Sequence, residues 1–144
     1  MLELDTFLPY RLNVLAKRIS RDLARRYEAQ FGLSIPEWRV IAILGQRQPL
    51  SSNDIVERTQ MDKAKVSRAV NRLVQAGLLE RATHPEDQRL LRLSFTDAGR
   101  DLYDRLSPQA LAWERQLLEA LAPEEAAQLH ALIDRLNSRL DEMG

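Results

Sequence analysis

Residues 50–96 read LSSNDIVERTQMDKAKVSRAVNRLVQAGLLERATHPEDQRLLRLSFT, and this stretch decides the fold. Ser51 is followed three residues later by Asp54, which is the spacing of a capping box at the start of a short helix. Asp62 is the expected cap of a second helix. The apolar side chains of that helix share one face, at Val66, Ala69, Val70 and Leu73. The stretch therefore predicts two helices separated by a short turn at residues 59–61.

The hydrophobic period changes after Gly77, the expected stop of the second helix. Apolar and polar side chains alternate over residues 91–95, which is the two-residue repeat of a strand. Residues 79–83 can pair with this strand as a hairpin, through a polar tip at residues 84–89. Two short helices followed directly by an exposed hairpin indicate a winged helix-turn-helix.

Two helices are predicted before this unit. Apolar side chains three or four residues apart cover residues 8–27, and Gly32 should end that helix. A second helix should begin at residues 34–36, with proline in its first turn, and end before Gly45. The side chains that it should bury are Trp38, Ile41 and Leu44.

Two further helices are predicted after the hairpin, beginning at Thr96 and at Pro123. An apolar stripe over residues 129–140 needs a partner surface, as do the leucines at residues 111–121. Two helix-turn-helix units related by a two-fold axis read half-sites about 10 base pairs apart, whereas one unit makes few base contacts. We therefore expect a homodimer, with a closed monomeric bundle as the alternative. The predicted fold class is mainly α (α+β), with six helices and a two-stranded wing.

The chain has 144 residues, of which 44% are apolar and 29% charged, and it contains no cysteine. The lack of cysteine excludes disulfides and thiolate metal sites and suits a cytoplasmic location. The longest apolar run, residues 40–44, is far too short to span a membrane. The 21 basic and 21 acidic side chains cancel, but residues 1–100 hold 17 basic and 12 acidic ones. A polyanion responds to this local positive charge rather than to the total.

The outer face of the second helix of the pair, residues 63–72, carries side chains suited to DNA. Arginine can donate two parallel hydrogen bonds to guanine, asparagine can bind adenine in the same manner, and lysine binds phosphate. At the hairpin tip, Asp87 can orient Arg89 for entry into a narrow minor groove. The predicted DNA-binding residues are Ser51, Lys63, Lys65, Ser67, Arg68, Asn71, Arg72, Asp87 and Arg89. The alternatives are an ordinary solvated helix face and a winged helix that docks another protein without reading DNA.

Residues 34–44 and 62–103 resemble the MarR family of bacterial transcriptional regulators. The most specific shared features are the Asp-x-Arg element at residues 87–89 and the step at residues 94–99, where Phe95 replaces the usual leucine. The positions that read the groove in this family fall here on Ser67, Arg68, Arg72 and, in the wing, Arg89.

The resemblance implies one protomer over residues 1–144, with a winged helix-turn-helix at 33–99 and dimerisation helices at 1–32 and 100–144. It also implies a homodimeric repressor that binds double-stranded DNA at a pseudo-palindromic operator. In such a regulator a small aromatic or acidic ligand releases the DNA.

Patterns for catalysis are lacking. The five glycines are isolated, so they form neither a dinucleotide fingerprint nor a phosphate-binding loop. His84 and His130 lack a second histidine at metal-binding spacing. We expect no enzyme activity, cofactor or metal. A small-molecule effector would bind where the first helix, the second helix and the winged unit meet. Its predicted lining residues are Tyr10, Arg11, Arg18, Trp38 and Trp113, with packing or solvation as the alternative role for each.

Overall fold

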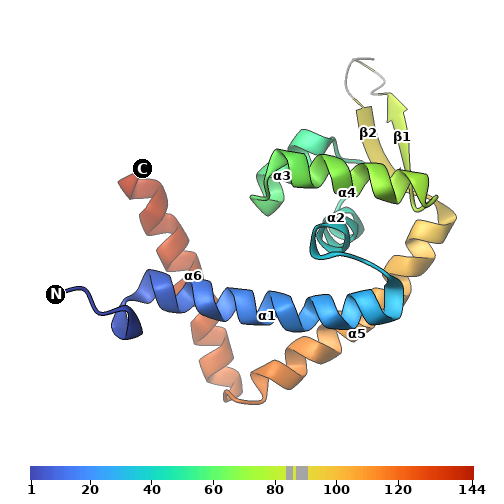
Figure 1. Ribbon diagram of the computed structural model, residues 1–144. Coiled ribbons are helices and arrows are strands. Elements are labelled where there is room, and N and C mark those ends of the chain that lie inside the picture. The colour runs from blue at the N-terminus through green and yellow to red at the C-terminus, as the bar shows by residue number, and fades with distance from the viewer. Residues whose placement is uncertain (84–85, 87–90) are drawn as a thin grey trace. The chain divides into compact units, whose positions relative to one another are not determined.

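The computed structural model describes residues 1–83, 86 and 91–144 (Figure 1). This part of the chain holds one short 3-10 helix, six α-helices and one antiparallel two-stranded sheet. In chain order the elements are η1 (Leu4–Thr6), α1 (Leu8–Phe31), α2 (Ile35–Gln46), α3 (Ser52–Thr59), α4 (Lys63–Gln75), β1 (Leu79–Thr83), β2 (Leu91–Phe95), α5 (Asp97–Leu118) and α6 (Pro123–Met143). They form two compact units, Met1–Tyr103 and Asp104–Gly144. The predicted fold class is confirmed.

The helix caps form as their sequence signals predict. The Ser51 hydroxyl accepts the Asp54 N–H at 3.1 Å while the Asp54 carboxylate accepts the Ser51 N–H at 3.0 Å, completing the capping box of α3. The Asp62 carboxylate caps α4 by accepting the Ala64 N–H at 3.0 Å. The Thr96 hydroxyl accepts the Gly99 N–H at 3.1 Å. Short polar residues therefore satisfy the free N–H groups that begin these helices.

The end of α2 differs from the expectation. The helix continues through Gly45 to Gln46 instead of ending before the glycine. A Cβ atom at position 45 would lie 2.0 Å from the ring of Tyr103, far closer than non-bonded atoms approach. The absence of a side chain at Gly45 thus leaves space for the Tyr103 ring against α2. The sequence analysis took the glycine as the end of the helix and did not predict this packing.

The buried residue in the first turns of α2 is Glu37, whereas the sequence analysis predicted that Trp38 would be buried there. The buried side chains of α2 are Glu37, Val40, Ile41 and Leu44, a regular stripe of one helical face. Trp38 lies beside that stripe, half-buried, with its ring centre 5.0 Å from that of Tyr27 on α1. The expected burial is correct for Ile41 and Leu44 and wrong for Trp38, which packs against Tyr27 from beside the stripe and stays partly exposed.

The core of the unit Met1–Tyr103 lies where α2, α3, α4 and the base of the hairpin meet (Figure 1). The whole predicted stripe of α4 is buried there. The two predicted strands pair as a hairpin, with Leu79 opposite Phe95 and Thr83 opposite Leu91. A contact that was not expected fixes its base: Leu50 exchanges two backbone hydrogen bonds with Leu93, at 2.7 and 3.1 Å. The segment before α3 therefore anchors the hairpin to the helix-turn-helix.

The capping box makes a prediction about pH. The hydrogen bond from the Ser51 backbone N–H lowers the pKa of the Asp54 carboxyl below its usual value of about 3.9. A depressed carboxyl pKa stabilises the fold above about pH 4, and this contribution is lost as the pH falls through the folded-state pKa. In urea unfolding, the Asp54→Asn variant should have a lower free energy of unfolding than the wild type at pH 7. This difference in free energy should become smaller below pH 4. A difference in free energy of unfolding that is the same at every pH would contradict a stabilising role for the ionised Asp54 carboxylate.

Candidate nucleic-acid interface

Helices α3 and α4 are joined by a tight turn. Gln60 takes the left-handed conformation, with φ of 58°, and its N–H donates to the Val56 carbonyl at 2.8 Å to close α3. The Met61 N–H then donates to the Thr59 hydroxyl at 3.3 Å, immediately before the cap at Asp62. This is the helix-turn-helix that the sequence predicted, and the hairpin follows α4 directly (Figure 1).

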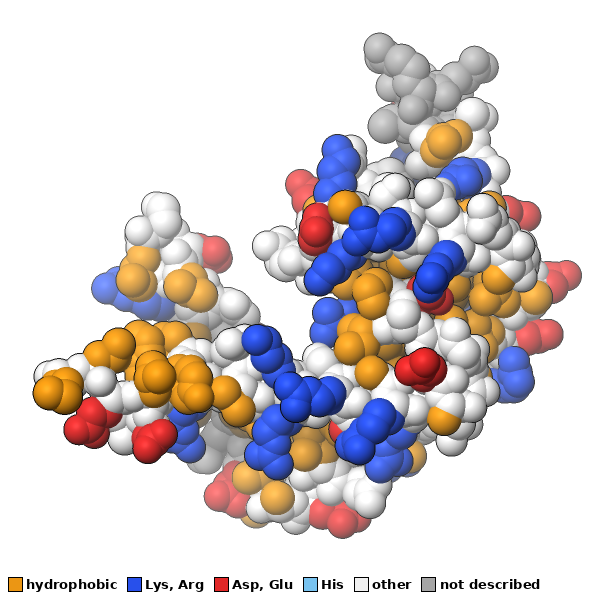
Figure 2. Space-filling model, in the orientation of Figure 1, with side chains coloured by type: hydrophobic (Ala, Val, Ile, Leu, Met, Phe, Trp, Pro, Cys, Tyr) orange, Lys and Arg blue, Asp and Glu red, His pale blue; other side chains and the backbone are white. Residues whose placement is uncertain are grey.

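The outer face of α4 is exposed and basic. With the apolar stripe buried, the side chains left in contact with solvent include Lys63, Ala64, Lys65, Ser67, Arg68, Asn71 and Arg72. Figure 2 shows lysine and arginine side chains gathered over the region of α3 and α4. The six predicted DNA-binding residues of α4 therefore share one accessible face, which combines phosphate-binding lysines with arginines able to reach base edges.

Arg72 is tied to α2. One of its terminal nitrogens, Nη1, lies 3.2 Å from Oε1 of Glu37. The Glu37 side chain is only 8% exposed, whereas that of Arg72 is 73% exposed. The guanidinium thus contacts Glu37 through one nitrogen, while most of the Arg72 side chain is exposed to solvent.

Asn71 is tied to the first strand of the hairpin. Its side-chain oxygen, Oδ1, accepts a hydrogen bond from Arg81 on β1. Pairing with adenine needs both the oxygen and the nitrogen of an asparagine amide, so Arg81 competes for half of the group that the sequence assigned to base reading. Arg81 itself is exposed, and sequence reasoning missed it because its contact joins two separate elements.

Two predicted residues lie in the wing. Asp87 and Arg89 are outside the described residues, so their part in DNA binding stays a prediction. Ser51 lies at the start of α3, partly exposed, with its hydroxyl engaged in the capping box.

Within the unit Met1–Tyr103, the predicted effector-binding residues line two separate hollows. Tyr10, Arg11 and Arg18 line a hollow of about 510 Å³ along the amino-terminal part of α1. Trp38 lines a separate hollow of about 260 Å³, with Arg39, Thr59 and three further residues of α2. Trp113 belongs to the other unit, Asp104–Gly144.

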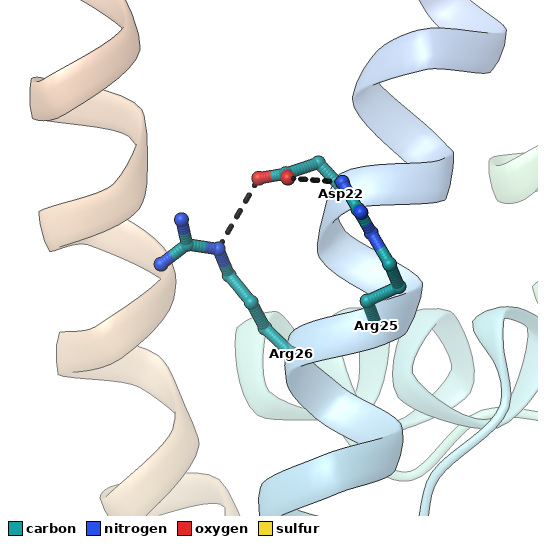
Figure 3. A network of polar contacts seen from close by, with 3 residues as sticks. All are labelled: Asp22, Arg25 and Arg26. Carbon is teal, nitrogen blue, oxygen red and sulfur yellow. Dashed lines mark hydrogen bonds and ion pairs between the residues drawn. The ribbon is translucent and has the colours of Figure 1, made fainter.

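Helix α1 also carries a local ion-pair cluster (Figure 3). The Asp22 carboxylate binds Arg25 at 2.9 Å and Arg26 at 3.2 Å, both on the same helix. Exposed pairs of this kind contribute little to stability, about 0.3–0.5 kcal/mol each. The cluster offsets part of the positive charge of α1 and lies apart from the exposed face of α4.

The helix-turn-helix with its attached hairpin defines a winged helix-turn-helix protein. The family model described as "MarR family" matches residues 31–90. A MarR/EmrR family transcriptional regulator from Acinetobacter sp. ADP1 is 31% identical in a structural match that covers 98% of this chain and 99% of that one, with a TM-score of 0.90. This chain belongs to the MarR family.

Two other similar proteins carry informative names. The homoprotocatechuate degradative operon repressor of Escherichia coli is 25% identical over 132 residues, covering 89% of each chain. The PcaV transcriptional regulator from Streptomyces coelicolor, solved in complex with its natural ligand, is 25% identical with 96% coverage of each chain and a TM-score of 0.77.

The chain is therefore a transcriptional regulator of the MarR type, which confirms the expectation of a regulator rather than an enzyme. Among the described residues, no helix has both the length and the apolar character needed to cross a bilayer.

Proposed function

We propose that this protein is a sequence-specific DNA-binding repressor that acts as a homodimer on a pseudo-palindromic operator. The observation that carries the proposal is the exposed basic face of α4, directly opposite a fully buried apolar stripe. A helix of this width fits the major groove of B-form DNA. In this arrangement Lys63 and Lys65 bind phosphates, and Ser67 and Arg68 approach base edges. Arg89 enters the adjacent minor groove with Asp87 as its orienting partner.

Two exposed apolar surfaces support the homodimer. On α1, Leu8, Leu12 and Leu15 are 46–50% exposed in the single protomer. On α6, residues 129–140 present five large apolar side chains that are 44–63% exposed: Leu129, Leu132, Ile133, Leu136 and Leu140. A second copy of the chain would cover such surfaces and supply the second DNA-reading unit. We assign residues 1–32 and 100–144 to dimerisation and residues 33–99 to the winged unit.

Repression and ligand release rest on the relatives and on the hollow of α1. One relative is named a repressor of a degradative operon, and one structural neighbour binds a natural ligand. The α1 hollow shares Leu8, Leu12 and Leu15 with the proposed dimer surface, so a ligand there would lie between the two copies. Arg11 and Arg18 also line the hollow, and arginine can bind a carboxylate through two parallel hydrogen bonds. We propose that a small aromatic or acidic ligand releases the DNA. A regulator of this kind works where the chromosome is, so a cytoplasmic location follows from the proposed function.

The test is a binding titration with the duplex upstream of the protein's own reading frame and a scrambled duplex of equal length and composition. Fluorescence anisotropy should show the upstream duplex bound about 10³-fold more tightly or better. Equal affinity for both duplexes would contradict sequence-specific binding and favour a winged helix that docks a protein. Aromatic acids and their thioesters, added to the complex, then test ligand release.

A further inference from the structure

Glu37 is a carboxylate in the apolar core. It lies on the buried face of α2 beside Val40 and Ile41, and the whole residue is only 6% exposed. Within the described part of the chain, Arg72 supplies its ion pair, through a contact of 3.2 Å. A buried carboxylate that loses its only cationic partner is strongly unfavourable. We therefore expect the Arg72 side chain to stay next to Glu37 instead of sampling its solvent-exposed rotamers freely.

The geometry leaves Arg72 available for a second contact. A guanidinium carries five N–H donors in a rigid plane, and the Glu37 contact engages the donor nitrogen Nη1. Since 73% of the Arg72 side chain is exposed, the donors that Glu37 does not use remain open to a second contact. A side chain that is already oriented loses less conformational entropy when it binds.

The neighbouring residue is constrained in the same turn of the helix. Asn71 is bonded to Arg81 of β1, while Arg72 is bonded to Glu37 of α2. Among the described residues Lys63, Lys65 and Arg68, towards the amino end of α4, form no ion pair. Two outer side chains in the carboxy-terminal half of α4 are thus bonded to other elements, whereas the three cationic side chains near its amino end form no ion pair among the described residues.

We propose that Glu37 is a positioning residue for DNA recognition, which holds the Arg72 guanidinium on the outer face of α4 in the orientation that contacts DNA. The proposal rests on the proposed function of the α4 face. It assigns Glu37 a role on DNA affinity that acts through Arg72 and not through direct contact, because the carboxylate is buried.

The test uses Glu37→Met, which keeps the volume and removes the carboxylate, and Glu37→Gln, which keeps an acceptor oxygen. For the upstream duplex, Glu37→Met should weaken binding by about tenfold, the usual size of a lost hydrogen bond to a charged group. Glu37→Gln should lie between Glu37→Met and the wild type. Adding Arg72→Ala to Glu37→Met should change the affinity by less than about twofold, because Arg72 has already lost its orientation.

Asp97→Asn is the control, since it removes an exposed carboxylate at the start of α5 that belongs neither to the proposed DNA-binding face nor to the dimerisation segments, and it should leave DNA affinity unchanged. Circular dichroism melts would show that each variant is folded at the binding temperature. A lowered Tm with wild-type affinity for Glu37→Met would overturn the proposal, as would a large additional loss of affinity on adding Arg72→Ala.

If the wild type itself does not prefer the upstream duplex, the proposed function fails instead, so the two failures are distinguishable. Should Glu37→Met not fold, Glu37→Gln carries the test: unchanged affinity in that variant would overturn the proposal.

Discussion

Replacing Ile133 by glutamate is expected to convert the proposed dimer into a monomer. Ile133 lies in the middle of the α6 stripe and is 46% exposed in the protomer. In the proposed dimer, burial of the part that is still exposed contributes about 1 kcal/mol per protomer, and a buried, unpaired carboxylate would cost several kcal/mol besides. A loss of about 4 kcal/mol raises the dissociation constant of the dimer about 10³-fold. Operator affinity should fall with it, because a monomer reads only one half-site.

The control is Ser138→Glu, which adds the same charge to the same helix. Position 138 is five residues beyond Ile133, and the helical repeat places it opposite the stripe. Analytical ultracentrifugation should show a dimer for the wild type and for Ser138→Glu, and a monomer for Ile133→Glu. A dimer of unchanged stability in Ile133→Glu would show that the α6 stripe is not the dimer interface.

Arg68→Ala is expected to give the largest single loss of operator recognition on α4. Arg68 is exposed, and no ion pair is found for it among the described residues. A lost arginine contact to a base edge costs about 1–3 kcal/mol, which is roughly a 5- to 150-fold loss of affinity. The preference for the upstream duplex over the scrambled duplex should decrease as well, because a base contact carries sequence information.

Lys65→Ala provides the comparison for Arg68→Ala. A phosphate contact carries no sequence information, so this variant should weaken binding to both duplexes by similar factors. Anisotropy titrations of the two variants on both duplexes measure the difference. Arg68→Ala would refute our assignment of base reading if it weakened the two duplexes equally.

The sequence predicted the elements whose signals are local. The caps at Ser51 and Asp62 depend on residues two or three positions away, and the strand at 91–95 shows its own alternation. Each of these features was found where the pattern indicated. The stripe of α4 belongs to the same class, because one helical period determines which side chains are buried.

The features that the sequence did not reveal are contacts between distant elements. Glu37 and Arg72 are 35 positions apart, and no local pattern distinguishes a buried glutamate from a solvated one. Gly45 is helical because a ring from Tyr103 occupies the space of its missing side chain. The pairing of Leu50 with Leu93 likewise depends on the folded core.

The sequence therefore predicted which residues form the candidate site more completely than it predicted the contacts among them. The sequence identified the exposed basic face of α4, since helical spacing separates it from the buried stripe. It assigned Asn71 and Arg72 to free base reading, but the structure bonds both to neighbouring elements. It could not identify Arg81, because an arginine in a strand has no local signal for contact with a helix.

The most direct test of DNA binding is the salt dependence of wild-type affinity for the upstream duplex, between 50 and 200 mM salt. Lys63 and Lys65 from each of two protomers would make four phosphate contacts, so log affinity should fall linearly with log salt concentration with a slope of about −4 or steeper. Such a slope would show that the protein displaces counterions from DNA, as the basic face of α4 predicts. A slope near zero would contradict a DNA-binding role for this face.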